Sequence, residues 1–205
     1  MKHECRRCGL CCRKGGPALH HDDRWLLEEL GLTSMVCLRS GEPAYDPRFD
    51  GVRFLQNELI KIRGKDEGWE CLHFDSASSG CSIYHCRPTE CRALSCSHVQ
   101  PVLDVINTPT LSRRDYVTEG SALWECICEH EKRFPASRAV EMAQNAAGTV
   151  PPRLDVELRD EVAFRRILAR HVKASDQDLW AYLGRPLWLV LRPYGTIYLN
   201  YRDAD

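Results

Sequence analysis

Four cysteines fall within eight residues near the start of the chain. Cys5, Cys8, Cys11 and Cys12 lie in the run CRRCGLCC, in which the last two are adjacent. Two intervening residues let a pair of sulfurs turn toward one ion, and Gly9 eases the turn after Cys8. Adjacent side chains point to opposite faces of an extended chain and lie about 100° apart on a helix. We therefore expect Cys12 to bind metal, while Cys11 serves a second centre or packs.

The chain has 12 cysteines among 205 residues, and none of them follows Cys128. The first residues, MKHECRRCG, lack the apolar region of a secretory signal, and the longest apolar run, LWLVL, is too short to cross a bilayer. We expect a cytoplasmic protein with no membrane attachment. In a reducing cytosol, dense cysteines more often bind metal or do redox chemistry than form disulfides. Disulfide staples and scattered buried thiols are the alternatives.

A second group of cysteines follows between residues 71 and 96: Cys71, Cys81, Cys86, Cys91 and Cys96. The last four recur at intervals of five, a spacing that keeps no constant face of a helix. Pro88 interrupts the run and starts a short helix. We expect these cysteines on turns and helix ends, from which several ligands can converge on a centre. Cys86 and Cys96 could serve a different centre from Cys81 and Cys91.

Three cysteines lie outside both groups. Cys126 and His130 share a helix face in WECICEHEK, and Cys128 points nearly opposite. Both of these cysteines are candidate ligands, with packing as the alternative for one of them. Cys37 is expected to be a buried thiol. Imidazole also binds these metals, so three histidines in or next to the second group are further candidates: His73, His85 and His98.

Basic residues surround the first cysteine run: Arg6, Arg7, Arg13 and Lys14. Positive charge lowers the pKa of a nearby thiol toward that of a ligating thiolate. It would also compensate the negative charge of a thiolate-ligated centre. A solvated basic face is the alternative. A nucleic-acid partner is not expected, because no aromatic residues are interleaved with these cations and the net charge is −1.

Apolar spacing and capping residues predict the secondary structure. Helices are expected over residues 20–32, 121–134, 136–148, 153–172 and 175–184, and a strand over residues 59–62. The segment LWLVLRPYGTIYLNY consists of two β-rich runs around Pro193, Tyr194 and Gly195, which predicts a terminal hairpin. The expected class is α+β and helix-rich: a loop-rich cysteine module organised around metal, with C-terminal helices and a β-hairpin.

We expect two parts along the chain. Residues 1–130 form a cysteine-cluster metal-binding module, because every cysteine lies within them. Residues 131–205 form a helical connector followed by the C-terminal helix and hairpin segment, within the usual size range of domains. The hairpin would offer a structural or partner surface.

These motifs together resemble the YkgJ-type cysteine cluster family, the CxxCxxCC zinc- or iron-chelating domain. The resemblance covers residues 3–96 and is carried by Cys5, Cys8, Cys11, Cys12, Cys71 and Cys81, then Ile83-Tyr84, Arg87-Pro88 and Cys91-Arg92. It implies a small domain that holds zinc or an iron–sulfur centre. Some relatives are described as iron–sulfur oxidoreductases, and flagellin lysine methylases are similar in their cysteine pattern. Arg87 and Arg92 would act as donors that orient the ligands, with a structural ion pair as the alternative for Arg87.

The predicted function is metal binding, by an iron–sulfur cluster or clusters held through cysteine thiolates, for electron transfer or other redox chemistry. Twelve thiols exceed one tetrahedral zinc site, and cluster proteins use spaced sets of four cysteines. The expected cluster ligands are Cys5, Cys8, Cys12, Cys71, Cys81 and Cys91. The wider set of metal candidates adds Cys11, Cys86, Cys96, Cys126 and Cys128.

Two other functions stay open at this point. One is a structural zinc-binding adaptor, since four-thiolate zinc sites also use CxxC pairs. The other is an iron–sulfur enzyme resembling flagellin lysine methylases. No nucleophile–base arrangement, phosphate loop or dinucleotide motif can be recognised in the sequence. The partner would be a redox protein or another protein whose identity the sequence does not give.

Overall fold

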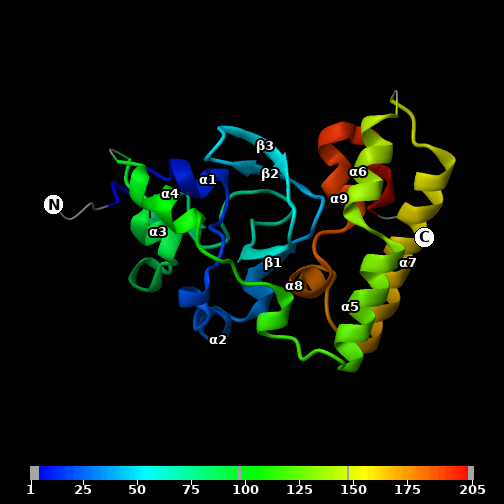
Figure 1. Ribbon diagram of the computed structural model, residues 1–205, viewed down its shortest axis with the longest axis horizontal. Helices are drawn as coiled ribbons and strands as arrows, with labels where there is room; N and C mark the ends of the chain where they lie inside the picture. The colour runs from blue at the N-terminus through cyan, green and yellow to red at the C-terminus, as the bar shows by residue number, and fades with distance from the viewer. Residues whose placement is uncertain (1–4, 97, 147, 203–205) are drawn as a thin grey trace. The chain divides into compact units, whose positions relative to one another are not determined.

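The computed structural model describes residues 5–96, 98–146 and 148–202 (Figure 1). The chain forms two compact units, each built from two separate stretches. Unit 1 comprises Met1–Val36 and Leu59–Asp115, and unit 2 comprises Cys37–Glu58 and Tyr116–Asp205. The predicted division into residues 1–130 and 131–205 stays a prediction. No helix in the described ranges combines the length and the apolar character that crossing a membrane requires.

Unit 1 is made of short elements. Its helices are α1 (Leu10–Lys14), α2 (Leu26–Leu30), α3 (Thr89–Ala93) and α4 (Gln100–Ile106), with 3-10 turns η1 (His21–Asp23), η2 (Leu32–Ser34), η3 (Tyr84–Cys86) and η4 (Arg113–Asp115). Its strands are β4 (Leu59–Ile62), β5 (Phe74–Asp75) and β6 (Gly80–Cys81), of which β5 and β6 pair antiparallel. β4 pairs with β1 (Met35–Leu38), which begins at the end of the first stretch. The predicted strand over residues 59–62 is confirmed.

Backbone hydrogen bonds join three distant segments of unit 1. The Leu19 amide donates to the Ile60 carbonyl at 2.8 Å, the Ile60 amide to the Leu111 carbonyl at 3.0 Å, and the Leu111 amide to the Leu19 carbonyl at 2.8 Å. All three side chains are fully buried. Gly16 lies so close to this junction that a Cβ there would come within 2.2 Å of the Ile62 carbonyl oxygen. The junction fixes where the first cysteine run enters the unit.

Unit 2 combines a hairpin with longer helices. The hairpin pairs β2 (Pro43–Asp46) with β3 (Gly51–Phe54), and the helices are α5 (Ala122–Arg133), α6 (Ala136–Gln144), α7 (Pro152–Val172), α8 (Trp180–Leu183) and α9 (Leu187–Leu191). Three 3-10 turns complete it: η5 (Gln177–Leu179), η6 (Arg192–Tyr194) and η7 (Thr196–Tyr201). Ser121 caps α5 by accepting from the Trp124 amide at 3.2 Å. The helix-rich α+β class is confirmed. α5, α6 and α7 confirm the helices predicted over residues 121–134, 136–148 and 153–172, although α6 ends at Gln144 and residue 147 lies outside the described residues. The helix predicted over residues 175–184 is instead η5 followed by the short helix α8.

The predicted C-terminal β-hairpin is wrong. Residues 187–201 form α9 and two 3-10 turns instead of two strands. Every side chain of Leu187–Leu191 is buried, so the run faces apolar neighbours on all sides and carries no alternation to mark a strand. Pro186 precedes α9 with φ −58°, a value compatible with starting a helix. Packing against α6 and α7 therefore overrides the β preference of the branched and aromatic residues.

A buried ionic group links α5 to α7 within unit 2. His130 and Glu161 are both fully buried, with Nε2 and Oε1 3.3 Å apart. Glu161 also pairs with Arg165, whose Nη1 lies 3.2 Å from Oδ1 of Asp176. Burial lowers the pKa of His130 to about 4, although Glu161 opposes the shift. Burial alone would raise the pKa of Glu161, but Arg165 and His130 outweigh it and hold the value at about 2.

These shifts predict that unit 2 loses stability in mild acid. Because the pKa of His130 is lowered in the folded protein, the unfolded chain takes up the proton first. The contribution is present above the usual value of 6.5 and is lost as the pH falls toward about 4. Because the pKa of Glu161 is also lowered in the folded protein, its contribution to stability is lost as the pH falls below 4.5. Between pH 7 and pH 5 we expect His130 to cost about 2 kcal/mol of unfolding free energy.

Urea unfolding followed by tryptophan fluorescence checks this expectation. His130→Gln should remove most of the decline between pH 7 and pH 5, since glutamine does not titrate there. His171→Gln is the matched control, because His171 is exposed at the end of α7 and should leave the decline unchanged. An undiminished decline in His130→Gln would show that another group is responsible.

Candidate metal centre

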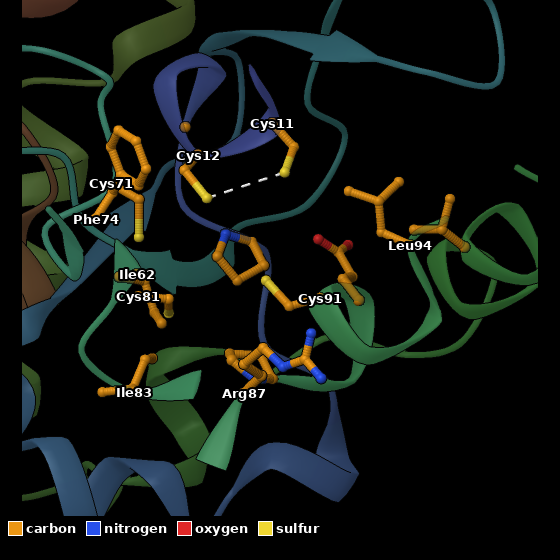
Figure 2. A pocket seen from close by; sticks show the side chains of 15 residues that line it. Cys11, Cys12, Ile62, Cys71, Phe74, Cys81, Ile83, Arg87, Cys91 and Leu94 are labelled. Carbon is orange, nitrogen blue, oxygen red and sulfur yellow. Dashed lines mark hydrogen bonds between the residues drawn. The ribbon is translucent and has the colours of Figure 1, made fainter. Parts of the chain in front are cut away.

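Five cysteines line one cavity of about 170 Å³ in unit 1: Cys11, Cys12, Cys71, Cys81 and Cys91. They come from both cysteine groups, so residues up to 80 positions apart in the sequence share one space. Figure 2 shows Cys11 and Cys12 on α1 at one side of the cavity and Cys91 on α3 facing them. The fold thus brings the two groups together around a common interior.

Local structure sets the position of α1. Gly9 precedes the helix with φ 74°, and a Cβ there would lie 2.3 Å from Cζ of Phe74. A side chain at this position would therefore collide with the aromatic wall of the cavity. The Cys71 amide donates to the Cys12 carbonyl at 2.8 Å, which ties the second cysteine group to α1. Cys81 lies on β6, directly opposite Phe74 of β5.

One buried and one partly buried carboxylate hold α3, and with it Cys91. Oδ1 of Asp23 accepts from the amide and the hydroxyl of Thr89 at 2.9 and 2.7 Å, at the N-terminus of the helix. Oε2 of Glu90 accepts from the Ala18 amide at 2.9 Å, and its Oε1 lies 3.3 Å from Nε2 of His20. Asp23 is fully buried. These bonds fix the helix to the segment that follows the first cysteine run.

Four thiols that line the cavity have raised pKa values and resist ionisation: Cys12, Cys71, Cys81 and Cys91. Burial raises the pKa of Cys12 to about 12, with further increases from Cys11, Cys71 and Cys81. Burial likewise raises the pKa of Cys91 well above the usual value, and Cys71 and Cys11 add to the effect. Each thiolate would thus be disfavoured by the low-dielectric surroundings and by its neighbours. A metal cation in the cavity would supply the charge that thiolate formation requires.

The prediction that the basic residues of the first run lower these thiol pKa values is wrong for the buried thiols. The guanidinium carbon of Arg7 lies 4.5 Å from the ring centre of Tyr84, and that of Arg13 lies 5.0 Å from the ring centre of Phe74. Both cations therefore stack on aromatic side chains. Burial raises the pKa values of Cys71 and Cys81 despite opposing effects from Lys61 and Arg87 respectively.

The two motif arginines lie close to the cavity but hold the backbone. Arg87 lines the cavity, stacks on Tyr84 at 3.8 Å and donates from Nε to the Tyr84 carbonyl at 3.0 Å. Arg92 donates from Nη1 to the Arg87 carbonyl at 2.6 Å and from Nη2 to the Thr89 hydroxyl at 2.8 Å. Their contacts stabilise the turn between η3 and α3, so they position the cysteines through the main chain.

A second, smaller cavity of about 60 Å³ adjoins the same sulfurs. It is lined by Cys5, Cys8, Cys11, Cys12, Cys81, Cys91 and Cys96. Among the described residues, no three His, Cys, Asp or Glu side chains already converge as the ligands of one ion. The sulfurs surround the two spaces without meeting at a point.

Other predicted candidates lie elsewhere. Cys86 is buried in η3, and among the described residues it is not part of the lining of either cavity. Cys126 and Cys128 lie on α5 in unit 2, and their assignment as ligands stays a prediction. The buried thiol expected at Cys37 is confirmed. Within the described ranges, none of the predicted histidines lines either cavity: His73, His85 and His98.

The donor set fits a thiophilic metal. Thiolate sulfur is the preferred ligand of zinc and of iron–sulfur clusters, whereas magnesium and calcium require oxygen ligands. Ile62, Phe74 and Ile83 form apolar parts of the larger cavity, and Glu90 is the one carboxylate residue that its described lining contains. The residues present thus fit zinc or an iron–sulfur group.

Comparison with known proteins gives one match. No curated protein and no solved structure matches this chain. A family model named CxxCxxCC and described as "Putative zinc- or iron-chelating domain" matches residues 4–110, just over half of the chain. The match spans both cysteine groups and the described lining of both cavities. The chain therefore belongs to the CxxCxxCC family of metal-chelating domains.

Proposed function

We propose that unit 1 binds an iron–sulfur cluster in its larger cavity and that the cluster serves electron transfer. The observation that carries the proposal is the size of this thiol-lined space. At about 170 Å³ it is more than ten times the roughly 15 Å³ that a cavity needs to hold one water molecule. A single zinc ion bound at about 2.3 Å from four sulfurs needs no such space. A cluster of iron and sulfide needs a space of this kind, because it contains several atoms besides the cysteine sulfurs.

Four cysteines are the proposed ligands: Cys12, Cys71, Cys81 and Cys91. Cys71 and Cys81 contribute to raising the pKa of Cys12, and Cys71 and Cys12 contribute to raising the pKa of Cys91. Such mutual effects are expected for sulfurs that share a small volume. Cys71 lines only the larger cavity. The set is narrower than the one proposed from the sequence, because Cys5 and Cys8 line only the smaller cavity.

The bound cluster would supply a one-electron carrier, and the surrounding residues would set its conditions. Ile62, Phe74 and Ile83 limit the access of water to the sulfurs. Lys61 and Arg87 place positive charge near Cys71 and Cys81, which favours the ligating thiolates. Leu10 on α1, directly before Cys11 in the sequence, is 66% exposed, and a redox partner would approach the centre from this apolar side chain.

Anaerobic purification tests the identity of the centre. We expect iron and acid-labile sulfide in comparable amounts, with a broad visible absorbance that dithionite bleaches, because thiolate-ligated clusters are coloured and reducible. Elemental analysis and sulfide determination on the same sample give the composition. Stoichiometric zinc without iron or sulfide in the larger cavity would contradict the proposal and favour a structural zinc protein.

Substitution of single cysteines tests the ligand assignment. Cys91→Ser and Cys12→Ser should each lower the affinity for the cluster by more than ~100-fold, which is the upper range for loss of an outer-shell partner. Unit 1 should also unfold at lower denaturant concentration, since metal binding and folding are coupled. Cys37→Ala is the matched control, because it removes a fully buried thiol of unit 2.

Cys86→Ala makes the assignment specific. It removes a buried thiol of unit 1 that is absent from the described lining of both cavities, so iron and sulfide should be retained. Loss of the cluster from Cys86→Ala, or full retention in Cys91→Ser, would show that the ligands have been assigned incorrectly.

A further inference from the structure

We infer that the exposed surface around α1 is the docking site of an acidic electron-carrier protein. This α1 surface consists of one apolar and four basic side chains, all of them exposed: Arg6, Arg7, Leu10, Arg13 and Lys14. The inference rests on the proposed function, which calls for a redox partner. It adds the charge of that partner and the face of unit 1 that receives it.

The charges of the α1 surface are all of one sign. Residues 5–20 contain four Arg or Lys residues and no Asp or Glu, in a chain whose net charge is −1. Within the described residues, no ion pair joins a carboxylate to any of these four cations. Elsewhere in unit 1, Lys65 does pair, with Glu70 at 2.9 Å. A cluster of cations of this kind attracts a negatively charged surface and repels a positively charged one.

Two of the four cations are already held in place. The guanidinium group of Arg7 stacks on the ring of Tyr84 at 4.5 Å, and that of Arg13 stacks on the ring of Phe74 at 5.0 Å. Nη1 of Arg13 also donates to the Cys8 carbonyl at 3.2 Å. Immobilising a long side chain on binding costs about 0.5–1.5 kcal/mol. The stacking contacts therefore reduce the entropy that is lost when a partner docks.

Leu10 supplies an apolar anchor within this basic surface. At 66%, its side chain has the largest exposed fraction among the large apolar side chains described in unit 1. Leu10, Arg13 and Lys14 lie on one side of α1, because residues three and four apart are neighbours on a helix. An apolar centre bordered by polar and charged residues is the usual composition of a protein–protein interface.

A single-stranded nucleic acid fits this surface less well. Such strands bind by stacking their bases on aromatic rings. The ring of Tyr84 is stacked against the guanidinium groups of both Arg7 and Arg87, and Phe74 is buried with Arg13 over its ring. The rings that the α1 cations contact are thus occupied by those cations. An acidic protein needs only the charges and the exposed leucine.

The α1 surface adjoins the thiols of the candidate metal centre. Cys11 follows Leu10 in α1, is exposed, and lines both cavities. Arg7 and Cys8 line the smaller cavity. An electron leaves a centre most readily where the surrounding thiols come nearest to the surface. A partner seated on Leu10 would lie next to such a place.

The experiment measures association of the full chain with flavodoxin, an acidic electron carrier, which serves as the probe. The fluorescence of the flavin reports the association rate constant and the Kd at low and at physiological salt. Arg6→Glu combined with Lys14→Glu reverses two cations that make neither of the stacking contacts, and Leu10→Ser removes the apolar anchor. The matched control combines Lys132→Glu with Arg170→Glu, which reverses two exposed cations of unit 2.

We expect physiological salt to lower the association rate constant of the unsubstituted chain by more than ~10-fold, because steering by charge is screened. The double reversal on the α1 surface should lower it by more than ~10-fold at low salt, and the control by much less. Leu10→Ser should raise the Kd by about 10-fold and leave the salt dependence unchanged. Far-ultraviolet circular dichroism checks that each variant is folded.

Three results would overturn the docking site. They are no association of the unsubstituted chain with flavodoxin at low salt, an equal loss in the two double variants, and displacement of flavodoxin by a tighter-binding oligothymidylate. Iron and sulfide are measured in the same samples, so the two proposals can fail separately. If protein without a cluster associates as expected, the acidic docking site stands and the iron–sulfur proposal falls. Protein that holds the cluster and does not associate gives the reverse.

Discussion

The crowding of buried thiols is the constraint on which unit 1 depends. Cys12, Cys71, Cys81 and Cys91 each have a raised pKa, because burial and the neighbouring sulfurs oppose negative charge. Cys12 and Cys91 lie on helices of five residues and Cys81 on a strand of two, elements too short to be stable alone, and Cys71 lies outside any helix or strand. A metal that draws the sulfurs together would thus provide part of the core that these elements lack.

Unit 2 is stabilised by different means. α5 packs against α8 through an apolar cluster that contains Ile127, Leu179 and Leu183. Buried charges occur there in hydrogen-bonded groups, as with Glu42, whose Oε2 lies 2.7 Å from Nη2 of Arg185. Helices that pack on an apolar core, together with buried ion pairs, are ordinary means by which a globular unit of this size is held together. Its cysteines are therefore not needed to explain its fold.

The sequence predicts those features that depend on neighbouring residues. Ser121 and the apolar stripe after it are enough to indicate α5. Burial on all sides hides the helical character of residues 187–191, because no polar face gives a period.

Long-range pairing leaves no local pattern at all. The junction of Leu19, Ile60 and Leu111 joins three segments that are far apart in the sequence, yet nothing in these apolar residues marks them as partners. For the same reason, the cations that act on Cys71 and Cys81 come from outside the basic run that the sequence singles out.

The order of the two stretches of unit 2 has a consequence for biosynthesis, because a ribosome releases Cys37–Glu58 long before Tyr116–Asp205. Until the later stretch emerges, Arg39 cannot donate to the Phe134 carbonyl, so the nascent chain must keep this charge hydrated while the metal-binding half is already complete.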